Sequence, residues 1–226
     1  MNARIVIVIP VYNEATVIGE VLAEIRKTGN FSIIVVDDGS RDDSFVQASA
    51  RGALALRHRI NRGKGAAVKT GIMAANLLEP DIVVTMDGDG QHDPADLSVL
   101  VQPILDGIAD VVLGSRTLNR HEMPKTKVVA NFFGNFFTWL LYGIWVSDSQ
   151  SGFRAYSKYA ALIIDTKADK YEYDSKVIRE IKTNRLKYAE VPVKTRYTDY
   201  SQGKGQKQGL VNGLITLFRM IWNMLT

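Results

Sequence analysis

The stretch TMDGDGQHDP, residues 85–94, places three carboxylates within seven positions directly after an apolar run. Carboxylates two residues apart on a continuing strand lie on the same face, and Gly88 between them lets the backbone turn so that Asp87 and Asp89 converge. Two such carboxylates without a counterion repel, and one of them would take up a proton. Mg²⁺ or Mn²⁺ removes the repulsion and prefers oxygen ligands together with substrate phosphates. Gln91 offers an amide oxygen at the next matching position, so the stretch predicts a cation site.

A structural alternative is an acidic turn that caps the following helix, with Asp93-Pro94 at its start. This alternative explains Asp93 but not the other two carboxylates or the glutamine. His92 is expected to face solvent or to be hydrogen-bonded rather than to act as a metal ligand.

The elements that position these residues are short β-branched runs alternating with stretches of helical period. Strands are expected at residues 4–10, 31–38, 53–58, 80–87 and 109–116, with helices between them. Strand–helix–strand units build a parallel sheet, so the expected fold class is α/β with an open, mostly parallel sheet flanked by helices. Ligands bind such sheets outside the carboxyl ends of the strands. The second half is less regular and shows no domain boundary, so residues 1–226 are expected to form one domain.

Composition limits the function classes. The 226 residues suffice for one large domain, and the absence of cysteine excludes disulfides and thiolate metal sites. Residues 1–115 carry 10 Lys and Arg against 15 Asp and Glu, whereas residues 116–226 carry 18 against 9. The acidic half suggests a cation site, and the basic half suggests phosphates or an anionic membrane surface rather than nucleic acid, since no nucleic-acid recognition module is visible. The N-terminus lacks the zones of a signal peptide, so a cytoplasmic location is expected.

Six motifs resemble, in order and spacing, those of family 2 of the inverting glycosyltransferases. They are VIPVYNE, VVDDGS, NRGKGAAVKTG, DGDGQHDP, GSR and DSQSGFRAYS. The similarity covers nearly the whole chain and is greatest to the dolichol- and polyprenyl-phosphate hexosyltransferases, the group of dolichol-phosphate mannose synthase. It implies the GT-A fold, a nucleotide-diphosphate sugar donor and Mg²⁺ or Mn²⁺. Residues 1–116 would form the nucleotide-sugar-binding half and residues 117–226 the acceptor-binding half.

The resemblance also assigns roles to matching positions. The residues expected to contact the nucleoside are Pro10, Tyr12, Glu14, Val36, Asp38, Asp87 and Gly88. Asp89 and Gln91 would hold the metal on the diphosphate, where a cation stabilises the charge of the leaving group. The motif around Lys64 lacks the spacing of a Walker phosphate loop. Its small residues are expected to let a helix pack closely beneath the donor, with the lysine a candidate for reaching a phosphate.

The acceptor decides whether the reaction needs a general base. A hydroxyl acceptor needs one, and Asp148 is the best candidate, although bonding to the amides of the turn that follows it is an equal alternative. A phosphate monoester, with a second pKa of about 6, is largely a dianion at neutral pH and needs only cations. The candidate cations are Arg116, Lys125, Lys127, Arg154 and Lys204. The resemblance favours Arg116 and Lys204, whereas Lys127 stands where the family often has arginine.

Two apolar stretches are candidates for contact with a membrane. Residues 128–145 are uncharged, and their polar residues recur at 131, 135, 138 and 142; residues 210–226 repeat the pattern at 212, 216, 219 and 223. These spacings place each polar stripe on one side of a helix, so both stretches are expected to be amphipathic helices with broad apolar faces. We expect them to pair and to lie in the membrane interface beside a lipid acceptor. Core packing or a dimer seam is the alternative.

The preferred hypothesis is metal-dependent, inverting transfer of a hexose from a UDP- or GDP-sugar to a polyprenyl phosphate by a protein peripheral to the inner face of the cell membrane. One alternative is transfer to a hydroxyl of a glycan or glycolipid, with Asp148 as base. Another is a non-catalytic nucleotide-sugar-binding membrane module. The sequence leaves open the sugar, the nucleotide, the metal and whether the chain forms a homo-oligomer or binds a membrane partner.

Overall fold

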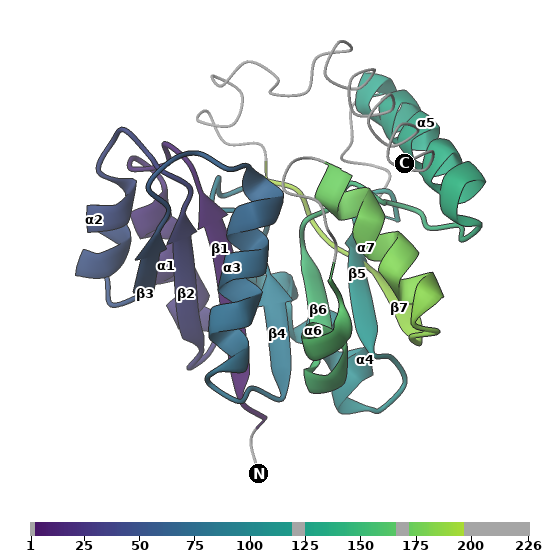
Figure 1. Cartoon of the computed structure of the whole chain (residues 1–226), viewed down its shortest axis with the longest axis horizontal. Coiled ribbons are helices and arrows are strands. Elements are labelled where there is room, and N and C mark those ends of the chain that lie inside the picture. Colours follow the sequence, from purple (N-terminus) through teal and green to yellow (C-terminus); the bar gives the residue numbers. More distant parts are fainter. Residues whose placement is uncertain (1–2, 119–124, 166–171, 197–226) are drawn as a thin grey trace.

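The structure, a computed structural model, describes residues 3–118, 125–165 and 172–196 (Figure 1). Its seven strands form one sheet in the order β3-β2-β1-β4-β6-β5-β7. The strands are β1 (Ile5–Val11), β2 (Ser32–Asp37), β3 (Leu54–Arg57), β4 (Ile82–Thr85), β5 (Val111–Ser115), β6 (Arg154–Ser157) and β7 (Tyr188–Pro192). Neighbouring strands pair in parallel except at β6, which is antiparallel to β4 and β5. The expected α/β class with a mostly parallel sheet is confirmed.

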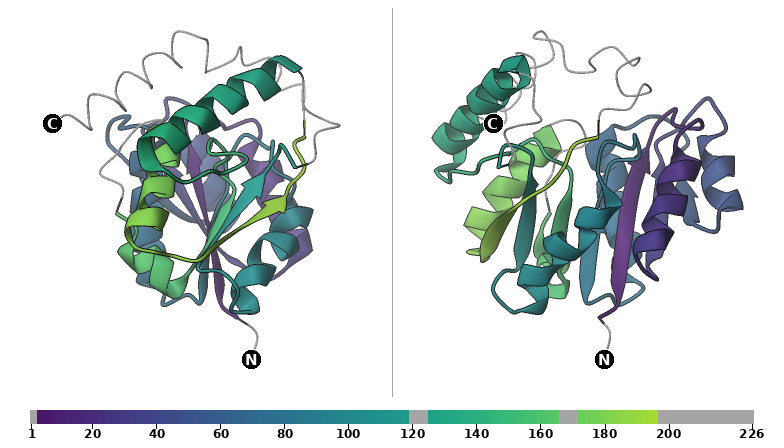
Figure 2. Two further views of the ribbon diagram at one scale, coloured as in Figure 1. Left: turned by 90° about the vertical axis from the view of Figure 1, so that its right-hand side faces the viewer. Right: turned by 180° about the vertical axis from the view of Figure 1, so that it is seen from behind.

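Helices cover both faces of this sheet (Figures 1 and 2). One face carries α1 (Ile18–Thr28), α2 (Ser44–Ala50), the short 3-10 helix η1 (Pro94–Asp96) and α4 (Leu97–Leu105). The other carries α3 (Lys64–Asn76), α6 (Lys158–Ile163) and α7 (Glu172–Thr183). The remaining helix, α5 (Lys125–Tyr142), crosses above the end of the sheet and packs against α7. Among the described helices, none combines the length and the apolar character needed to cross a membrane.

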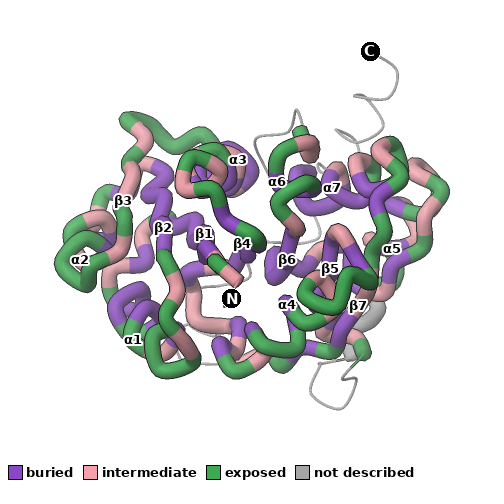
Figure 3. Tube along the Cα trace, turned by 90° about the horizontal axis from the view of Figure 1, so that it is seen from below, coloured by how far each residue is buried: buried purple, intermediate pink, exposed green. Residues whose placement is uncertain are grey.

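The central strands contribute side chains to two separate hydrophobic cores, because successive side chains of a strand point to opposite faces of the sheet. Ile7 and Ile9 share a core with α1 and α4, whereas Val6 and Val8 share one with α3 and α7. All four side chains are fully buried, and Figure 3 shows the long buried runs along these strands. Strands buried on both faces are continuous apolar runs, which is why the sequence predicted them.

Small residues bring α3 close to the sheet, as expected. Its buried positions include Gly65, Ala66, Ala67, Gly71 and Ala75. A Cβ at Gly71 would collide with the side chain of Val8 and would lie 3.2 Å from Cγ2 of Val36. This close approach places Lys64, the first residue of the helix, over the carboxyl ends of the strands.

The second half of the chain is more regular than the sequence indicated. It contributes β6, β7 and α6, none of which was expected, and α7, whose start at Glu172 and Asp174 the sequence does predict. Because β6 runs against β4 and β5, its N-terminal end lies at the edge where those two strands end. The loop before β6, which carries Asp148, therefore reaches the same edge of the sheet as the polar residues of the first half.

We expect Gly71→Val to lower the free energy of unfolding by about 2 kcal/mol or more, because the added methyl groups have no space between α3 and β1. Urea unfolding followed by circular dichroism measures the change. Met73→Ala on the exposed side of the same helix is the control and should stay within about 0.5 kcal/mol of wild type. An unchanged midpoint for Gly71→Val would show that α3 can move off the sheet at little cost.

Candidate active site

The loops after β1 and β2 are bound to each other at the edge of the sheet. The backbone N–H of Asn13 donates to Oγ of Ser40 at 2.9 Å, and that of Glu14 donates to Oγ of Ser44 at 2.7 Å. Glu14 and Pro10 are buried beneath this contact, whereas Tyr12 is exposed. Tyr12 is thus the residue of the predicted nucleoside loop whose side chain is open to a ligand.

The other predicted nucleoside contacts, Val36 and Asp38, lie on β2 and directly after it. The side chain of Val36 belongs to the core shared with α3 and offers no surface to a ligand. The Asp38 carboxylate accepts from Nδ1 of His58 at 2.7 Å and from the backbone N–H groups of Arg62 and Gly63 at 3.0 and 2.7 Å. Asp38 therefore shapes the loop that leads into α3.

Lys64 lies between two carboxylates. Its ammonium is 2.8 Å from Oδ1 of Asp87 and 3.4 Å from Oδ2 of Asp174, at the start of α7. Burial alone would lower the pKa of Lys64, but the charges of Asp174 and Asp87 raise it, so the side chain stays charged. Gly152 packs against this pair, since a Cβ there would lie 2.6 Å from Nζ of Lys64 and 2.9 Å from Oδ1 of Asp87. The structure thus joins α3, β4 and α7 through charge.

The two central aspartates of the acidic stretch differ in their surroundings. Burial would raise the pKa of Asp87, but Lys64 and the nearby His92, whose Nε2 is 3.4 Å away, hold it well below its usual range. Burial raises the pKa of Asp89, and the negative charge of Asp87 raises it further. His92 and the backbone N–H of Gln91 offset these effects on the pKa of Asp89 only in part.

Mg²⁺ or Mn²⁺ fits this set of donors. Such ions take one or two protein carboxylates together with substrate phosphate oxygens, and the half-buried Asp89 forms no ion pair with a lysine or arginine among the described residues. Gln91, the second predicted ligand, is held near Asp89, because its backbone N–H donates to Oδ1 of Asp89 at 3.0 Å. In the described ranges, no three His, Cys, Asp or Glu side chains converge as a metal site.

The segment after β7 clamps the acidic stretch, which the sequence did not indicate. The backbone N–H of Arg196 donates to the carbonyl of Gln91 at 2.8 Å. Its guanidinium bonds Oδ1 of Asp93 at 2.8 Å and also the carboxylate of Glu24 on α1. His92 is buried rather than facing solvent and lies against the ring of Phe153, with centroids 4.9 Å apart. These contacts hold the acidic stretch to the segment after β7, to α1 and to Phe153.

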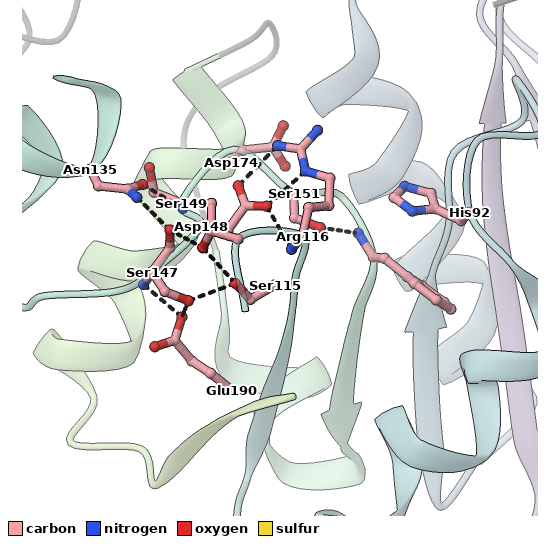
Figure 4. Close-up of polar contacts among 12 residues, drawn as sticks. His92, Ser115, Arg116, Asn135, Ser147, Asp148, Ser149, Ser151, Asp174 and Glu190 are labelled. Carbon is pink, nitrogen blue, oxygen red and sulfur yellow. Dashed lines mark hydrogen bonds and ion pairs between the residues drawn. The ribbon is translucent and has the colours of Figure 1, made fainter. Parts of the chain in front are cut away.

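Arg116 and Asp148, both predicted to be catalytic, bind each other (Figure 4). Nε and Nη2 of Arg116 donate to the two carboxylate oxygens at 2.7 and 2.9 Å, and the backbone N–H of Arg116 donates at 3.1 Å. Burial would raise the pKa of Asp148, but the charge and hydrogen bonds of Arg116 lower it. A carboxylate so engaged is a weak base. Neither role considered for Asp148, base or cap of the following turn, describes this contact.

The loop that carries Asp148 is fastened on both sides. Oγ of Ser147 lies 2.6 Å from Oγ of Ser115, the residue before Arg116, and both N and Oγ of Ser147 donate to Oε1 of Glu190 on β7 at 2.7 Å. Asn135 of α5 holds the same loop through the backbone of residues 147 and 149. Sequence reasoning missed Ser147, Glu190 and Asn135 as site residues, and the polar stripe on residues 128–145 was the only signal for the last.

Arg154 does not reach the surface of the site. It is only 1% exposed, and its Nη2 donates to the backbone carbonyls of Ser149 and Asp174 at 2.9 and 3.0 Å. The charge of Asp174, with Oδ1 at 3.6 Å, compensates it. The structure therefore favours an internal role that joins β6 to α7 over the expected role as a ligand of the acceptor phosphate.

The expected amphipathic helix over residues 128–145 is present as α5, and its polar stripe faces the protein. Asn131, Asn135 and Thr138 are buried, whereas Phe132, Phe133 and Trp139 are 53%, 55% and 44% exposed. Four exposed residues of α5 and the exposed Trp145, which follows the helix, form what we call the aromatic face of α5; the four are Phe132, Phe133, Trp139 and Leu140. Its rings contact one another, with Trp145 6.3 Å from Phe132 and 6.4 Å from Trp139 between centroids.

Some predicted residues cannot be placed. Lys204 and the second amphipathic stretch, residues 210–226, lie outside the described residues. Lys127 lies in the first turn of α5, but its side chain is not among those described. The structure leaves their roles, and the pairing of the two apolar helices, as predictions.

Comparison with known proteins identifies the family to which the chain is similar. Residues 6–162 match the family described as Glycosyl transferase family 2. The chain is 38% identical over 223 residues to UDP-N-acetylglucosamine–dolichyl-phosphate N-acetylglucosaminyltransferase of Methanococcus voltae, with 89% of each chain covered. It is 28% identical over 220 residues to undecaprenyl-phosphate mannosyltransferase of Micrococcus luteus, covering 93% of this chain and 90% of that one. Its fold is similar to that of glucosyl-3-phosphoglycerate synthase from Mycobacterium tuberculosis, crystallised with Mn²⁺, uridine diphosphate and phosphoglyceric acid, with a TM-score of 0.69 and 22% identity over 96% of this chain and 78% of that one. The expected GT-A fold is confirmed.

We expect Asp148→Asn to lower the free energy of unfolding at neutral pH by about 3 kcal/mol, because it leaves the Arg116 guanidinium without a paired charge. The folded-state pKa of Asp148 lies below its ordinary value of about 4. Its stabilisation is therefore fully present above that value and is lost as the pH falls through the folded-state pKa. Urea unfolding of both proteins across this range measures the difference, which should be constant near neutrality and shrink in acid. A loss that is independent of pH would contradict the ion pair.

Proposed function

Because the chain belongs to glycosyl transferase family 2 and is a glycosyltransferase, we propose that it transfers a hexose from a nucleotide-diphosphate sugar to a polyprenyl phosphate. Relatives named for dolichyl phosphate and undecaprenyl phosphate support this acceptor class. A uridine-diphosphate sugar is the first donor to consider, since the relative at 38% identity is named for one. The observation that carries the proposal is the ion pair between Arg116 and Asp148.

This ion pair favours a phosphate acceptor over a hydroxyl acceptor. A hydroxyl acceptor needs a base, but both oxygens of Asp148 are taken by Arg116 and its pKa is lowered, so it would accept a proton poorly. A phosphate monoester is already largely a dianion at neutral pH and needs a positive charge beside it. Arg116 supplies that charge at the edge of the sheet, where its side chain is 26% exposed. Its Nη1 makes no hydrogen bond to the described residues.

In the proposed reaction, a free oxygen of the lipid phosphate forms a bond to the anomeric carbon. The bond between that carbon and the β-phosphate oxygen breaks, and its electron pair leaves with the nucleoside diphosphate. Attack from the face opposite the leaving group inverts the anomeric carbon, and no proton has to be moved. Arg116 holds the acceptor phosphate, with Lys127 and Lys204 as further proposed ligands.

On the donor side, Tyr12, Glu14 and Asp38 are the proposed nucleoside-binding residues, together with Gly88. The backbone at Gly88 lies against β1, since a Cβ there would come within 2.6 Å of Cγ1 of Val11. Asp89 and Gln91 would hold Mg²⁺ or Mn²⁺, with Asp87 beside them. The bound ion would neutralise charge that builds up on the leaving diphosphate.

We also propose that the aromatic face of α5 lies in the membrane interface at the inner face of the cell membrane. Tryptophan suits the depth of the lipid headgroups, and tryptophan, phenylalanine and leucine are typical of the apolar face that an interfacial helix buries in lipid. The inward polar stripe supports this orientation, because the helix directs its hydrogen-bonding groups to the protein and its apolar groups outward. A lipid acceptor would then arrive at the same end of the sheet.

The proposed reaction predicts a product of defined mass. Purified protein with Mn²⁺ or Mg²⁺, a short polyprenyl phosphate and a panel of UDP- and GDP-hexoses should yield a polyprenyl-phosphate hexose, detected by mass spectrometry. We expect Asp89→Ala to reduce turnover by about a hundredfold or more, because it removes the metal ligand at the leaving group. Thermal unfolding of Asp89→Ala checks that the fold is retained.

Two outcomes would contradict the proposal. Transfer to a polyprenol or glycan hydroxyl but not to the phosphate would favour the hydroxyl alternative. Nucleotide binding without turnover on any acceptor would favour a non-catalytic module.

The membrane proposal predicts that replacing Phe132, Phe133 and Trp139 with serine weakens co-sedimentation with anionic vesicles by about tenfold or more, because three exposed aromatic side chains lose their burial in lipid. The control replaces Met73 and the 85% exposed Leu77 near the far end of α3, which should leave binding unchanged. If the triple variant binds vesicles as wild type does but no longer dimerises in gel filtration, the face is a dimer seam instead.

A further inference from the structure

The side chain of Asn135 brackets Asp148. Its Nδ2 donates to the backbone carbonyl of Ser147 at 2.5 Å, and its Oδ1 accepts from the backbone N–H of Ser149 at 2.9 Å. These are the residues on either side of Asp148. Asn135 is only 4% exposed, so one buried amide fixes both flanking residues and with them the direction in which the carboxylate points.

Asp148 in turn fixes Arg116. The carboxylate receives three hydrogen bonds from Arg116, two from the guanidinium and one from the backbone. A planar guanidinium held at two nitrogens by one carboxylate has little freedom to rotate. Displacement of the Asp148 backbone would therefore displace the Arg116 guanidinium.

The amide that holds this loop belongs to α5, the helix with the outward aromatic face. The outer side of α5 exposes Phe132 and Trp139, and its inner side carries Asn135. The position of α5 over the end of the sheet is thus linked to the position of Arg116 by two steps, from Asn135 to the 147–149 loop and from Asp148 to the arginine.

We infer that Asn135 is a positioning residue for the acceptor site, which holds Asp148 and through it orients the Arg116 guanidinium toward the acceptor phosphate. This inference rests on the proposed function for the role of Arg116 toward phosphate. Asn135 itself touches neither substrate nor metal in this account. The contrasting possibility is that the amide only fastens α5 to the protein and has no bearing on Arg116.

Asn131 provides a matched control. It lies one turn before Asn135 on the same inward stripe and is 7% exposed. Neither its Oδ1 nor its Nδ2 has a hydrogen-bond partner in the part of the chain described here. Asn131→Ala therefore removes the same group from the same helix face without releasing the loop, and its removal should cost little stability.

The kinetic experiment compares Asn135→Ala and Asn131→Ala with wild type. Asn135→Ala should raise KM for polyprenyl phosphate about tenfold or more, because a small displacement of the phosphate-binding arginine weakens the aligned complex. KM for the sugar donor should stay within about twofold, since the donor half of the site is not touched. Asn131→Ala should leave both values unchanged. In an Arg116→Lys background, Asn135→Ala should add little, because residues that act through one another are not additive.

A second measurement does not depend on activity. The Nε–H of Arg116, which donates to Asp148 at 2.7 Å, gives an arginine side-chain signal in ¹⁵N NMR that Arg116→Lys identifies. We expect its solvent exchange to speed up about tenfold or more in Asn135→Ala and to stay unchanged in Asn131→Ala. This measurement tests the positioning even if wild type transfers no sugar to polyprenyl phosphate, a result that would count against the proposed function instead.

The inference is overturned by any of three results. These are an unchanged exchange rate for Arg116 in Asn135→Ala, an equal rise in KM for donor and acceptor, and a loss of melting temperature alone with the acceptor KM unchanged. Faster exchange together with a selective rise in acceptor KM supports it.

Discussion

A guanidinium and a carboxylate joined by two short hydrogen bonds hold together the edge of the sheet at which β5 ends and β6 begins. Both groups are costly to bury, and each is compensated chiefly by the other. The pair joins the residue after β5 to the loop before β6, segments that are 32 positions apart in the chain. Hydrogen bonds around the pair hold these two segments together. They are made by Ser115, Ser147, Glu190 and Asn135.

The acidic stretch after β4 is organised by a different balance of charge. Lys64 lies between the carboxylates of Asp87 and Asp174, so it compensates part of the acidic stretch and joins helices from both halves of the chain. The pKa of Asp89 is raised. In the proposed function, a divalent ion bound to the diphosphate would compensate the negative charge of this carboxylate. The protein thus compensates Asp87 through Lys64 and compensates the charge of Asp89 only in part. This division gives the two halves of the site separate supports at one edge of the sheet.

The sequence predicted the strands of the first half and the edge at which they end, because these strands are apolar runs whose parallel pairing brings their ends together. The contacts made by the second half were harder to predict. Asp148 was assigned as a base or a turn cap, since nothing near it in the sequence indicates that Arg116 is its partner. Arg154 was predicted to be a ligand of the acceptor phosphate, because its burial depends on β6, a four-residue strand that runs against its neighbours and gave no clear pattern. The spacing of the polar residues of α5 predicted a helix with two unlike faces, but spacing carries no information on which face turns inward.

The contact of Gly152 with the Lys64–Asp87 pair limits which residues this position can accept. A methyl group at position 152 would meet the ammonium of Lys64, which is the free end of a flexible side chain and can swing aside. It would also come within 2.9 Å of Oδ1 of Asp87, so both members of the ion pair would have to shift. Because every atom that the methyl group meets belongs to a side chain, an alanine at this position would alter the charge balance of the acidic stretch rather than the path of the backbone.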